Sequence, residues 1–156
     1  STSRAKYCLS ATAQKDGIRL IAVIMAAPDY KARFQDGATL LNLGFATCSL
    51  YEDKSTVKKK VPVKKSVQRE GICENKKKFS YLDTEGKFLS KIEKKIQLKE
   101  SVEAPVTKGM KAGEIQYYLE NEKIGSIDLV FSQNIEKARY VDYLKMVLEK
   151  FFRNRD

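Results

Sequence analysis

The sequence predicts a mainly β fold: a small antiparallel β-sandwich domain, with a strand–strand–helix piece before it and an amphipathic helix after it. Three observations lead to this prediction. Short apolar runs of period two recur between residues 54 and 134, separated by turn signals. A continuous apolar run at 18–27 precedes residues with helical spacing. Near the C-terminus, apolar residues repeat at i, i+3 and i+4.

The first 45 residues predict two strands and one helix. Residues 7–13 form a short apolar strand, and the Ile- and Val-rich run 18–27 suits a strand buried on both faces. A turn signal at 15–17 separates them. Asp29 is a candidate helix N-cap, and Gly44 predicts the end of that helix. Two strands and one helix leave sheet edges unpaired and a face uncovered, so this piece is expected to need partners.

The middle of the chain predicts a series of short strands in which apolar and polar residues alternate. The apolar members are Val57, Val61 and Val63; Phe79 and Tyr81; Ile92, Ile96 and Leu98; Ile115, Tyr117 and Leu119; and Ile127, Leu129 and Phe131. Turn signals lie at 83–86, 108–109 and 120–122. Strands at this spacing are typical of a small antiparallel sandwich or barrel. Pro62 and Pro105 are expected at strand edges or strand starts.

Residues 135–156 predict an amphipathic helix of about 18 residues. We expect its apolar face to lie against a membrane surface; the membrane-facing residues are Tyr140, Val141, Leu144, Val147, Leu148, Phe151 and Phe152. Arg153 and Arg155, which follow the two phenylalanines, suit a helix lying in the interface. Two alternatives stay open: packing against its own domain, and packing against another copy of the chain.

Composition excludes several kinds of chemistry. The chain has 156 residues, a formal net charge of +10 and no histidine. It therefore lacks a Ser-His-Asp or Cys-His nucleophile pair and any imidazole ligand for a metal. Cys8, Cys48 and Cys73 are odd in number and show no CxxC spacing, so a disulfide framework is not expected. The longest apolar run, 20–27, is far shorter than the roughly 20 residues of a membrane-spanning helix. No cofactor and no metal are expected.

Positive charge is concentrated at residues 54–78, which hold ten basic and two acidic residues. This basic segment could bind a polyanion, such as anionic lipid, a cell-wall polymer or nucleic acid. The alternative is a solvated face of strands and loops. Sequence-specific recognition of nucleic acid is disfavoured, because the chain has 23 lysines against 7 arginines and no zinc-finger spacing. We expect no nucleic-acid partner.

Six stretches of the sequence together form a recognisable pattern: YCLSATA at 7–13, DGIRLIAVIM at 16–25, KARF at 31–34, LLNLGF at 40–45, APVTKG at 104–109 and AGEI at 112–115. These stretches resemble one family, the low-molecular-mass penicillin-binding proteins, which are serine D-alanyl-D-alanine carboxypeptidases. In that family the first of these stretches follows the Lys-Thr-Gly active-site strand, and residues 1–5 resemble the residues just after that triplet. The last two stretches resemble the C-terminal β-domain, and the terminal helix is similar to the family's membrane anchor.

The resemblance implies three parts and a role for each. Residues 1–45 would be the C-terminal remnant of an α/β catalytic domain, 46–134 a β-sandwich stalk, and 135–156 an anchor helix. The parent enzyme would trim peptidoglycan stem peptides and bind β-lactams at the outer face of the bacterial cytoplasmic membrane, although this chain carries no signal peptide. Thr2 would line the rim of the parent's substrate cleft.

The resemblance also implies that the chain alone is not catalytic. The family relies on Ser-x-x-Lys, Ser-x-Asn and Lys-Thr-Gly motifs, and no Lys-Thr-Gly is present. Ser3 with Lys6, Ser55 with Lys58 and Ser132 with Asn134 match the other two patterns, at a frequency that chance explains. We therefore expect no catalytic residue. Two further hypotheses stay open: a basic β-domain that binds a polyanion, and a dimer formed through the unpaired strands at 7–27.

Overall fold

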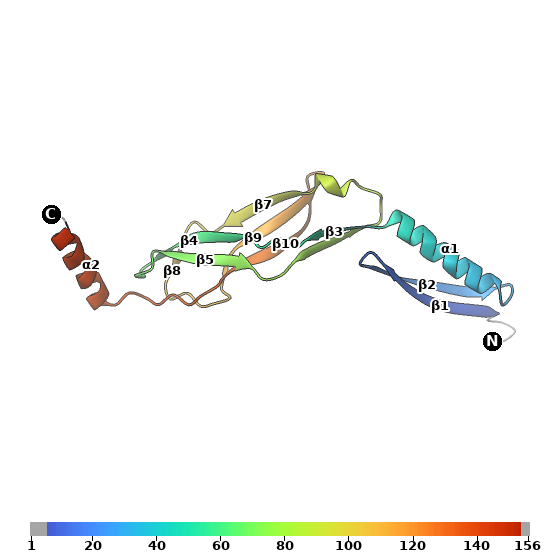
Figure 1. The fold of residues 1–156 in the computed structure, drawn as a ribbon, viewed down its shortest axis with the longest axis horizontal. Helices are drawn as coiled ribbons and strands as arrows, with labels where there is room; N and C mark the ends of the chain where they lie inside the picture. The colour runs from blue at the N-terminus through green and yellow to red at the C-terminus, as the bar shows by residue number, and fades with distance from the viewer. Residues whose placement is uncertain (1–5, 154–156) are drawn as a thin grey trace. The chain divides into compact units, whose positions relative to one another are not determined.

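The computed structural model describes residues 6–153, with side chains described at 6–148. The fold is mainly β, as predicted, with one helix near each end of the chain (Figure 1). The chain forms two compact units, residues 1–52 with 80–90, and residues 53–79 with 91–156. Each unit is described by itself below. The three-part division expected from the family resemblance stays a prediction.

The first unit begins with a β-hairpin. Strands β1 (Tyr7–Lys15) and β2 (Ile18–Ala27) pair antiparallel, with Lys15 opposite Ile18. Asp16 and Gly17 both have positive φ, +50° and +82°, which is the backbone that a tight two-residue hairpin turn requires. The two strands and the turn predicted between them are confirmed.

Helix α1 (Ala32–Thr47) packs on one face of this hairpin (Figure 1). The N-cap is Lys31 and not Asp29 as predicted, but the Asp29 carboxylate accepts the backbone N–H groups of Lys31 and Ala32 and so stabilises the start of the helix. Gly44, however, does not end the helix, which continues to Thr47. A Cβ on Gly44 would lie 2.7 Å from Leu20 Cδ1, so this glycine lets the helix approach β2 closely.

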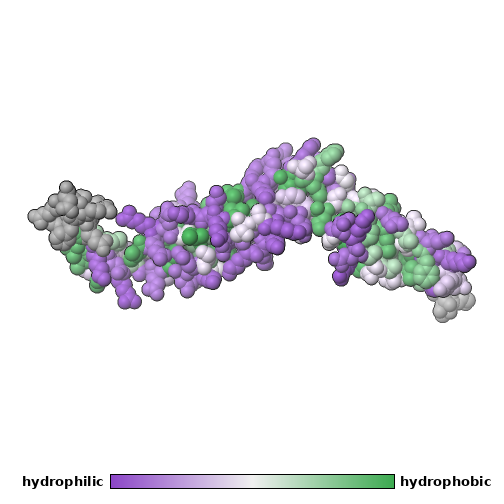
Figure 2. Space-filling model, viewed as in Figure 1, coloured by the Kyte–Doolittle hydropathy of each residue, from purple (hydrophilic) through white to green (hydrophobic). Residues whose placement is uncertain are grey.

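The other face of β2 is apolar and exposed, so the prediction that this strand is buried on both faces is wrong for the described residues. Ile21, Val23 and Met25 are 67%, 60% and 77% exposed, and Figure 2 shows apolar side chains on the visible surface of this unit. Among the described residues, β1 and β2 pair only with each other. The hairpin therefore keeps two open edges and an uncovered apolar face, which agrees with the expectation that it needs partners. Strands β3 (Ser49–Asp53) and β6 (Phe79–Asp83) form a second two-stranded sheet.

The second unit is built on a six-stranded sheet with the order β7-β9-β10-β5-β4-β8. Its strands are β4 (Lys58–Lys64), β5 (Glu70–Asn75), β7 (Glu93–Leu98), β8 (Val102–Glu103), β9 (Lys111–Leu119) and β10 (Glu122–Phe131). The pairs are antiparallel except β4 with β8. A short 3-10 helix, η1 (Leu89–Lys91), precedes β7. Pro62 lies in β4 where β8 does not reach, on a free edge as predicted.

The core of this unit comes from the alternating positions of β4, β9 and β10. The fully buried apolar side chains are Val61, Val106, Ile115, Tyr117, Leu129 and Phe131. The ring of Phe79 stacks on Tyr117, with centroids 3.8 Å apart. Five of these six residues, all but Val106, belong to the runs predicted as strands, so the period-two pattern identified the core correctly.

One glycine of β9 is expected to be indispensable for the sheet. A Cβ on Gly113 would lie 2.3 Å from the backbone oxygen of Gln97 and 2.9 Å from Leu98 Cα, so β7 would have to move. We expect Gly113→Ala to lower the free energy of unfolding by about 2–3 kcal/mol. Urea denaturation followed by circular dichroism measures the change. Gly37→Ala in α1, where the nearest atom is a leucine methyl at 3.1 Å, is the control and should stay near neutral; equal stability of both variants would contradict the prediction.

Candidate functional site

The C-terminal helix α2 (Tyr140–Arg153) is the first candidate site, because its apolar face is uncovered. At its start, the carboxylate of Asp142, in the first helical turn, accepts the backbone N–H of Arg139, the residue just before the helix, at 2.8 Å. The side chains on its apolar face are between 47% and 83% exposed: Tyr140, Val141, Leu144, Val147 and Leu148. A row of exposed apolar residues on a helix is typical of a binding surface.

The other predicted site residues lie outside the described parts. Phe151 and Phe152 belong to α2, but their side chains are not among those described, and Thr2 precedes the described residues. Over residues 6–153, no helix has the length and apolar character to cross a membrane. Contact of α2 with a membrane surface stays a prediction.

The serines that match catalytic patterns are engaged in structural hydrogen bonds. The Ser55 hydroxyl donates to Asp53 Oδ1 at 2.6 Å, and the Ser132 hydroxyl donates to the backbone oxygen of Ile72 at 3.1 Å. The Asn134 side chain accepts the backbone N–H of Lys108 at 2.6 Å. Ser3 lies outside the described residues. In these contacts the hydroxyls of Ser55 and Ser132 donate to a carboxylate and to a backbone oxygen, and the absence of a catalytic residue stays a prediction.

A charged network is buried where β3 ends, and the sequence analysis did not find it. Asp53 is 7% exposed. Its Oδ2 accepts the Tyr117 hydroxyl at 2.7 Å and pairs with Lys94 Nζ at 2.6 Å, and its Oδ1 accepts from Ser55. Burial by itself would raise the pKa of Asp53, but the hydrogen bonds from Lys94, Ser55 and Tyr117 together hold it well below its usual range. The network ties residues 53–55 to β7 and β9.

A second charged cluster covers β9 and β10 on the exposed side of the sheet. Glu114 accepts hydrogen bonds from Gln116, Lys111 and Lys123, and these lower its pKa to about 2. Lys111 also pairs with Asp128 at 2.5 Å. Figure 2 shows hydrophilic side chains over most of the visible surface of this unit. These exposed pairs are screened by water and add little to stability.

The basic segment 54–78 is neutralised in part by its own strands. Lys58 pairs with Glu74 at 3.9 Å and Lys60 with Glu70 at 2.9 Å, across the β4–β5 ladder. Binding of a polyanion by this segment stays a prediction. Among the described residues, no group of three His, Cys, Asp or Glu side chains is placed to hold a metal ion.

Comparison with known proteins finds that this chain is similar to penicillin-binding proteins and D-alanyl-D-alanine carboxypeptidases. The family model described as "Penicillin-binding protein 5, C-terminal domain" matches residues 45–137. D-alanyl-D-alanine carboxypeptidase DacF of Bacillus subtilis is 30% identical over 150 residues, which cover 94% of this chain and 38% of that protein. D-alanyl-D-alanine carboxypeptidase DacA of Haemophilus influenzae is 27% identical over 162 residues, which cover 97% of this chain and 40% of that protein.

Solved structures agree with the sequence relatives. Penicillin-binding protein 5 of Haemophilus influenzae superposes with a TM-score of 0.65 and 26% identity, over 87% of this chain and 40% of that one. The carboxypeptidase DacD of Francisella tularensis shares the fold, with a TM-score of 0.55 at 20% identity, over 88% of this chain and 35% of that one. The chain thus spans about two fifths of the length of the curated relatives that it matches.

These matches confirm the resemblance drawn from the sequence to the low-molecular-mass penicillin-binding proteins. The family model covers the β3 to β10 region, and the curated relatives extend the similarity to both units. The chain belongs to the penicillin-binding protein 5 C-terminal domain family.

Proposed function

We propose that this chain is the C-terminal part of a D-Ala-D-Ala carboxypeptidase that trims peptidoglycan stem peptides, and that it is not catalytic by itself. The observation that carries the proposal is its similarity, over 94% of its length, to a carboxypeptidase of which it spans 38%. The chain has no Lys-Thr-Gly. Three residues from its matches to the Ser-x-x-Lys and Ser-x-Asn patterns, Ser55, Ser132 and Asn134, form hydrogen bonds within the fold. The reaction is then performed elsewhere in the parent enzyme.

In the parent, a serine would attack the carbonyl of the penultimate D-alanine and become acylated, with a lysine as its base. β-Lactams would acylate the same serine. The β1–β2 hairpin and α1 would form the end of that α/β catalytic domain, with Thr2 at the rim of the cleft. The exposed Ile21, Val23 and Met25 support this role, because they provide an apolar face for the rest of the domain.

The remaining parts would hold the catalytic domain near the membrane. Residues 46–134 would act as a stalk and 135–156 as an anchor, with the exposed apolar face of α2 lying in the interface. This arrangement would place the parent at the outer face of the bacterial cytoplasmic membrane, where its peptidoglycan substrate is found. The uncovered apolar side chains of α2 support the anchor role.

We expect the isolated chain to release no D-alanine from a peptide ending in D-Ala-D-Ala. The measurement is an enzymatic assay for free D-alanine, with a full-length carboxypeptidase as the positive control. Ser55→Ala and Ser132→Ala variants identify the source of any activity. Release of D-alanine by the wild-type chain would contradict the proposal. Loss of that release in one of the variants would show which serine is responsible.

We also expect the isolated chain to dimerise through its hairpin. The open edges of β1 and β2 and the apolar face beside them have no cover within the described residues, so a second copy is the available partner. Light scattering during size-exclusion chromatography should give twice the chain mass of 17.8 kDa. An Ile21→Asp, Val23→Asp double variant should be monomeric. A wild-type chain that stays at 17.8 kDa when concentrated would contradict this expectation.

A further inference from the structure

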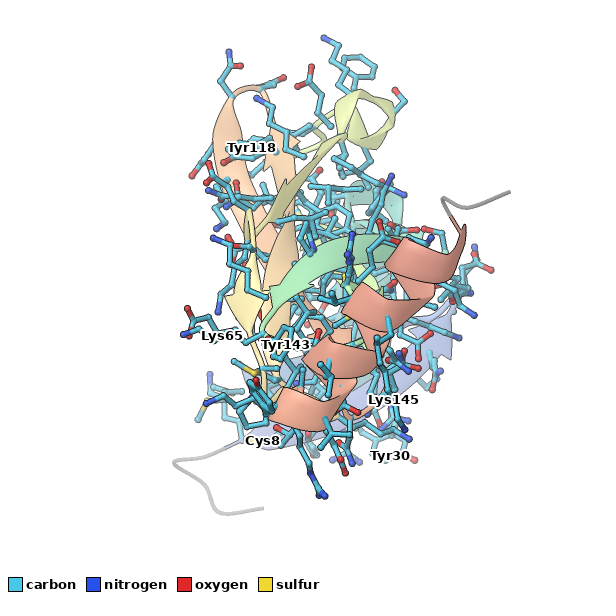
Figure 3. All side chains as sticks on the ribbon, turned by 90° about the vertical axis from the view of Figure 1, so that its left-hand side faces the viewer. Cys8, Tyr30, Lys65, Tyr118, Tyr143 and Lys145 are labelled. Atoms are coloured by element: carbon cyan, nitrogen blue, oxygen red, sulfur yellow. The ribbon has the colours of Figure 1, made fainter. Side chains whose placement is uncertain are left out.

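The tip of the β4–β5 hairpin, residues 64–69, lies beside helix α2 in the second unit. Together they line a pocket of about 450 Å³ whose walls include Lys64, Lys65, Arg69, Tyr143, Met146 and Val147. Figure 3 shows Lys65 and Tyr143 next to each other on the two elements. One wall is basic and the opposite wall is apolar, so the pocket has the two-sided character of a surface at a lipid–water boundary.

Hydrogen bonds hold the hairpin tip against the segment that leads into α2. The Ala138 backbone N–H donates to the Lys65 oxygen at 2.8 Å. Within the tip, the Ser66 hydroxyl contacts the backbone oxygens of Val63 and Gln68 at 3.1 and 2.6 Å. The tip and the segment that leads into α2 are therefore connected, and α2 begins beside the tip.

Positive charge exceeds negative charge around this pocket. Glu103 pairs with Lys65 at 2.7 Å, and its pKa is lowered by Lys65 first and then by Lys64 and Lys137. Three ammonium groups thus surround one carboxylate. Among the described residues, Lys64, Arg69 and Lys137 form no ion pair, in contrast to Lys58 and Lys60 further along β4. The acidic Glu136 and Asp142 line a neighbouring depression, and Asp142 accepts the backbone N–H of Arg139.

An exposed apolar residue lies at the end of the hairpin. Val67 is 52% exposed, lies between Lys65 and Arg69 in sequence, and lines the neighbouring depression, which Lys137 and Arg139 share with the two acidic residues. On α2, Val147 and Leu144 are 65% and 50% exposed. Cations next to exposed apolar residues on two connected elements match the anionic headgroup and the acyl region of a bilayer.

We propose that the β4–β5 hairpin tip is a second membrane contact, which binds the phosphate headgroup of an anionic phospholipid together with α2. Lys64, Lys65 and Arg69 hold the phosphate, and Val67 enters the interface beside the apolar face of α2. This inference rests on the proposed anchoring of α2 and adds a headgroup preference that an apolar helix alone does not provide. A soluble polyanion would need the cations but not the apolar residues.

The chain contains no tryptophan, so single tryptophans report their own surroundings. Three variants of the full chain are compared: Val67→Trp at the tip, Val141→Trp on α2, and Glu122→Trp at the opposite end of β10 from the tip. With vesicles of phosphatidylglycerol and phosphatidylcholine in equal parts, we expect a blue shift of emission for the first two and none for the third. A shift for Val141→Trp without one for Val67→Trp would overturn the second contact and leave the anchor proposal intact. No shift at either position would overturn both.

Charge-removing variants test the headgroup preference by vesicle flotation. We expect the Lys64→Gln, Arg69→Gln double variant to bind the same vesicles roughly 10- to 30-fold more weakly. The matched control is Lys76→Gln, Lys77→Gln, which removes the same charge beyond the far end of β5. The six residues of β5 separate these lysines from the tip by about 20 Å, which exceeds the Debye length of about 8 Å. The control should lose less than about threefold. Equal losses in both double variants, or the same loss on pure phosphatidylcholine, would overturn the proposal.

Discussion

Replacing Asp53 by alanine is expected to lower the free energy of unfolding by about 3–4 kcal/mol. The variant leaves the buried Tyr117 hydroxyl without its acceptor and Lys94 without its partner carboxylate. Lys94 is 39% exposed, so water solvates part of its charge, and the expected loss lies in the lower part of the range of about 3–5 kcal/mol for breaking a fully buried pair. Urea denaturation at neutral pH measures the difference.

Asp128→Ala is the matched control for this prediction. Asp128 also pairs with a lysine, Lys111, but its side chain is 57% exposed. Its loss should cost less than about 1 kcal/mol. If the two variants were equally stable, the Asp53–Lys94 pair would contribute no more than an ordinary surface pair, and its burial would add nothing to the free energy of unfolding.

The effect of Asp53 is also expected to depend on pH in one direction. Its pKa in the folded chain lies below the ordinary value of 3.8, so its contribution is fully present above that value. As the pH falls from the ordinary pKa of an aspartate through the lower pKa of Asp53 in the folded chain, the carboxylate is protonated and its contribution is lost. The stability difference between the wild type and Asp53→Ala should therefore shrink below about pH 3.5. A difference that stays constant down to strongly acidic pH would contradict the assigned shift.

A Leu144→Asp, Val147→Asp double variant is expected to weaken binding to lipid vesicles by at least about 100-fold. Burial of each apolar side chain contributes about 1.5–3 kcal/mol, and a factor of ten corresponds to about 1.4 kcal/mol. Both residues lie on the exposed apolar face of α2, and neither is in the buried core. Flotation with vesicles of phosphatidylglycerol and phosphatidylcholine measures the change.

The Ile21→Asp, Val23→Asp variant of the β1–β2 hairpin is the control for vesicle binding. It makes the same number of apolar-to-acidic changes, at residues that are 67% and 60% exposed. At a chain concentration low enough for the wild type to be monomeric, we expect this variant to bind vesicles as the wild type does. A comparable loss in both would show that exposed apolar residues attract lipid regardless of their place, and the assignment of α2 as the anchor would be wrong. Circular dichroism checks that both variants stay folded.

Elements with a strong apolar period were predictable from the sequence. The run 18–27 became β2, and the alternation around Ile115 and Ile127 became β9 and β10. Strand β5 was missed, because its inward positions are Gly71, Cys73 and Asn75, which show no apolar alternation. Gly71 is small for a reason that only the structure reveals: a Cβ there would lie 2.6 Å from the Phe131 ring.

Contacts between distant segments could not be predicted. Asp53 meets Tyr117 across 64 positions of the chain, and no local pattern links a turn aspartate to a tyrosine in a later strand. The turn-forming spacing of Asp53 and Ser55 is the one signal that the sequence offered. In the same way, the hairpin tip and α2 are separated by some seventy residues, and their proximity comes from the fold.

If this chain is part of a larger enzyme that carries the reactive serine, a β-lactam should label that enzyme. The most direct test labels the source sample with fluorescent penicillin, and then reads the intact mass and the peptides of each labelled species. We expect an adduct on a species much heavier than 17.8 kDa whose peptides include this sequence. An adduct on the 17.8 kDa chain itself, or labelled species that all lack this sequence, would contradict the proposal.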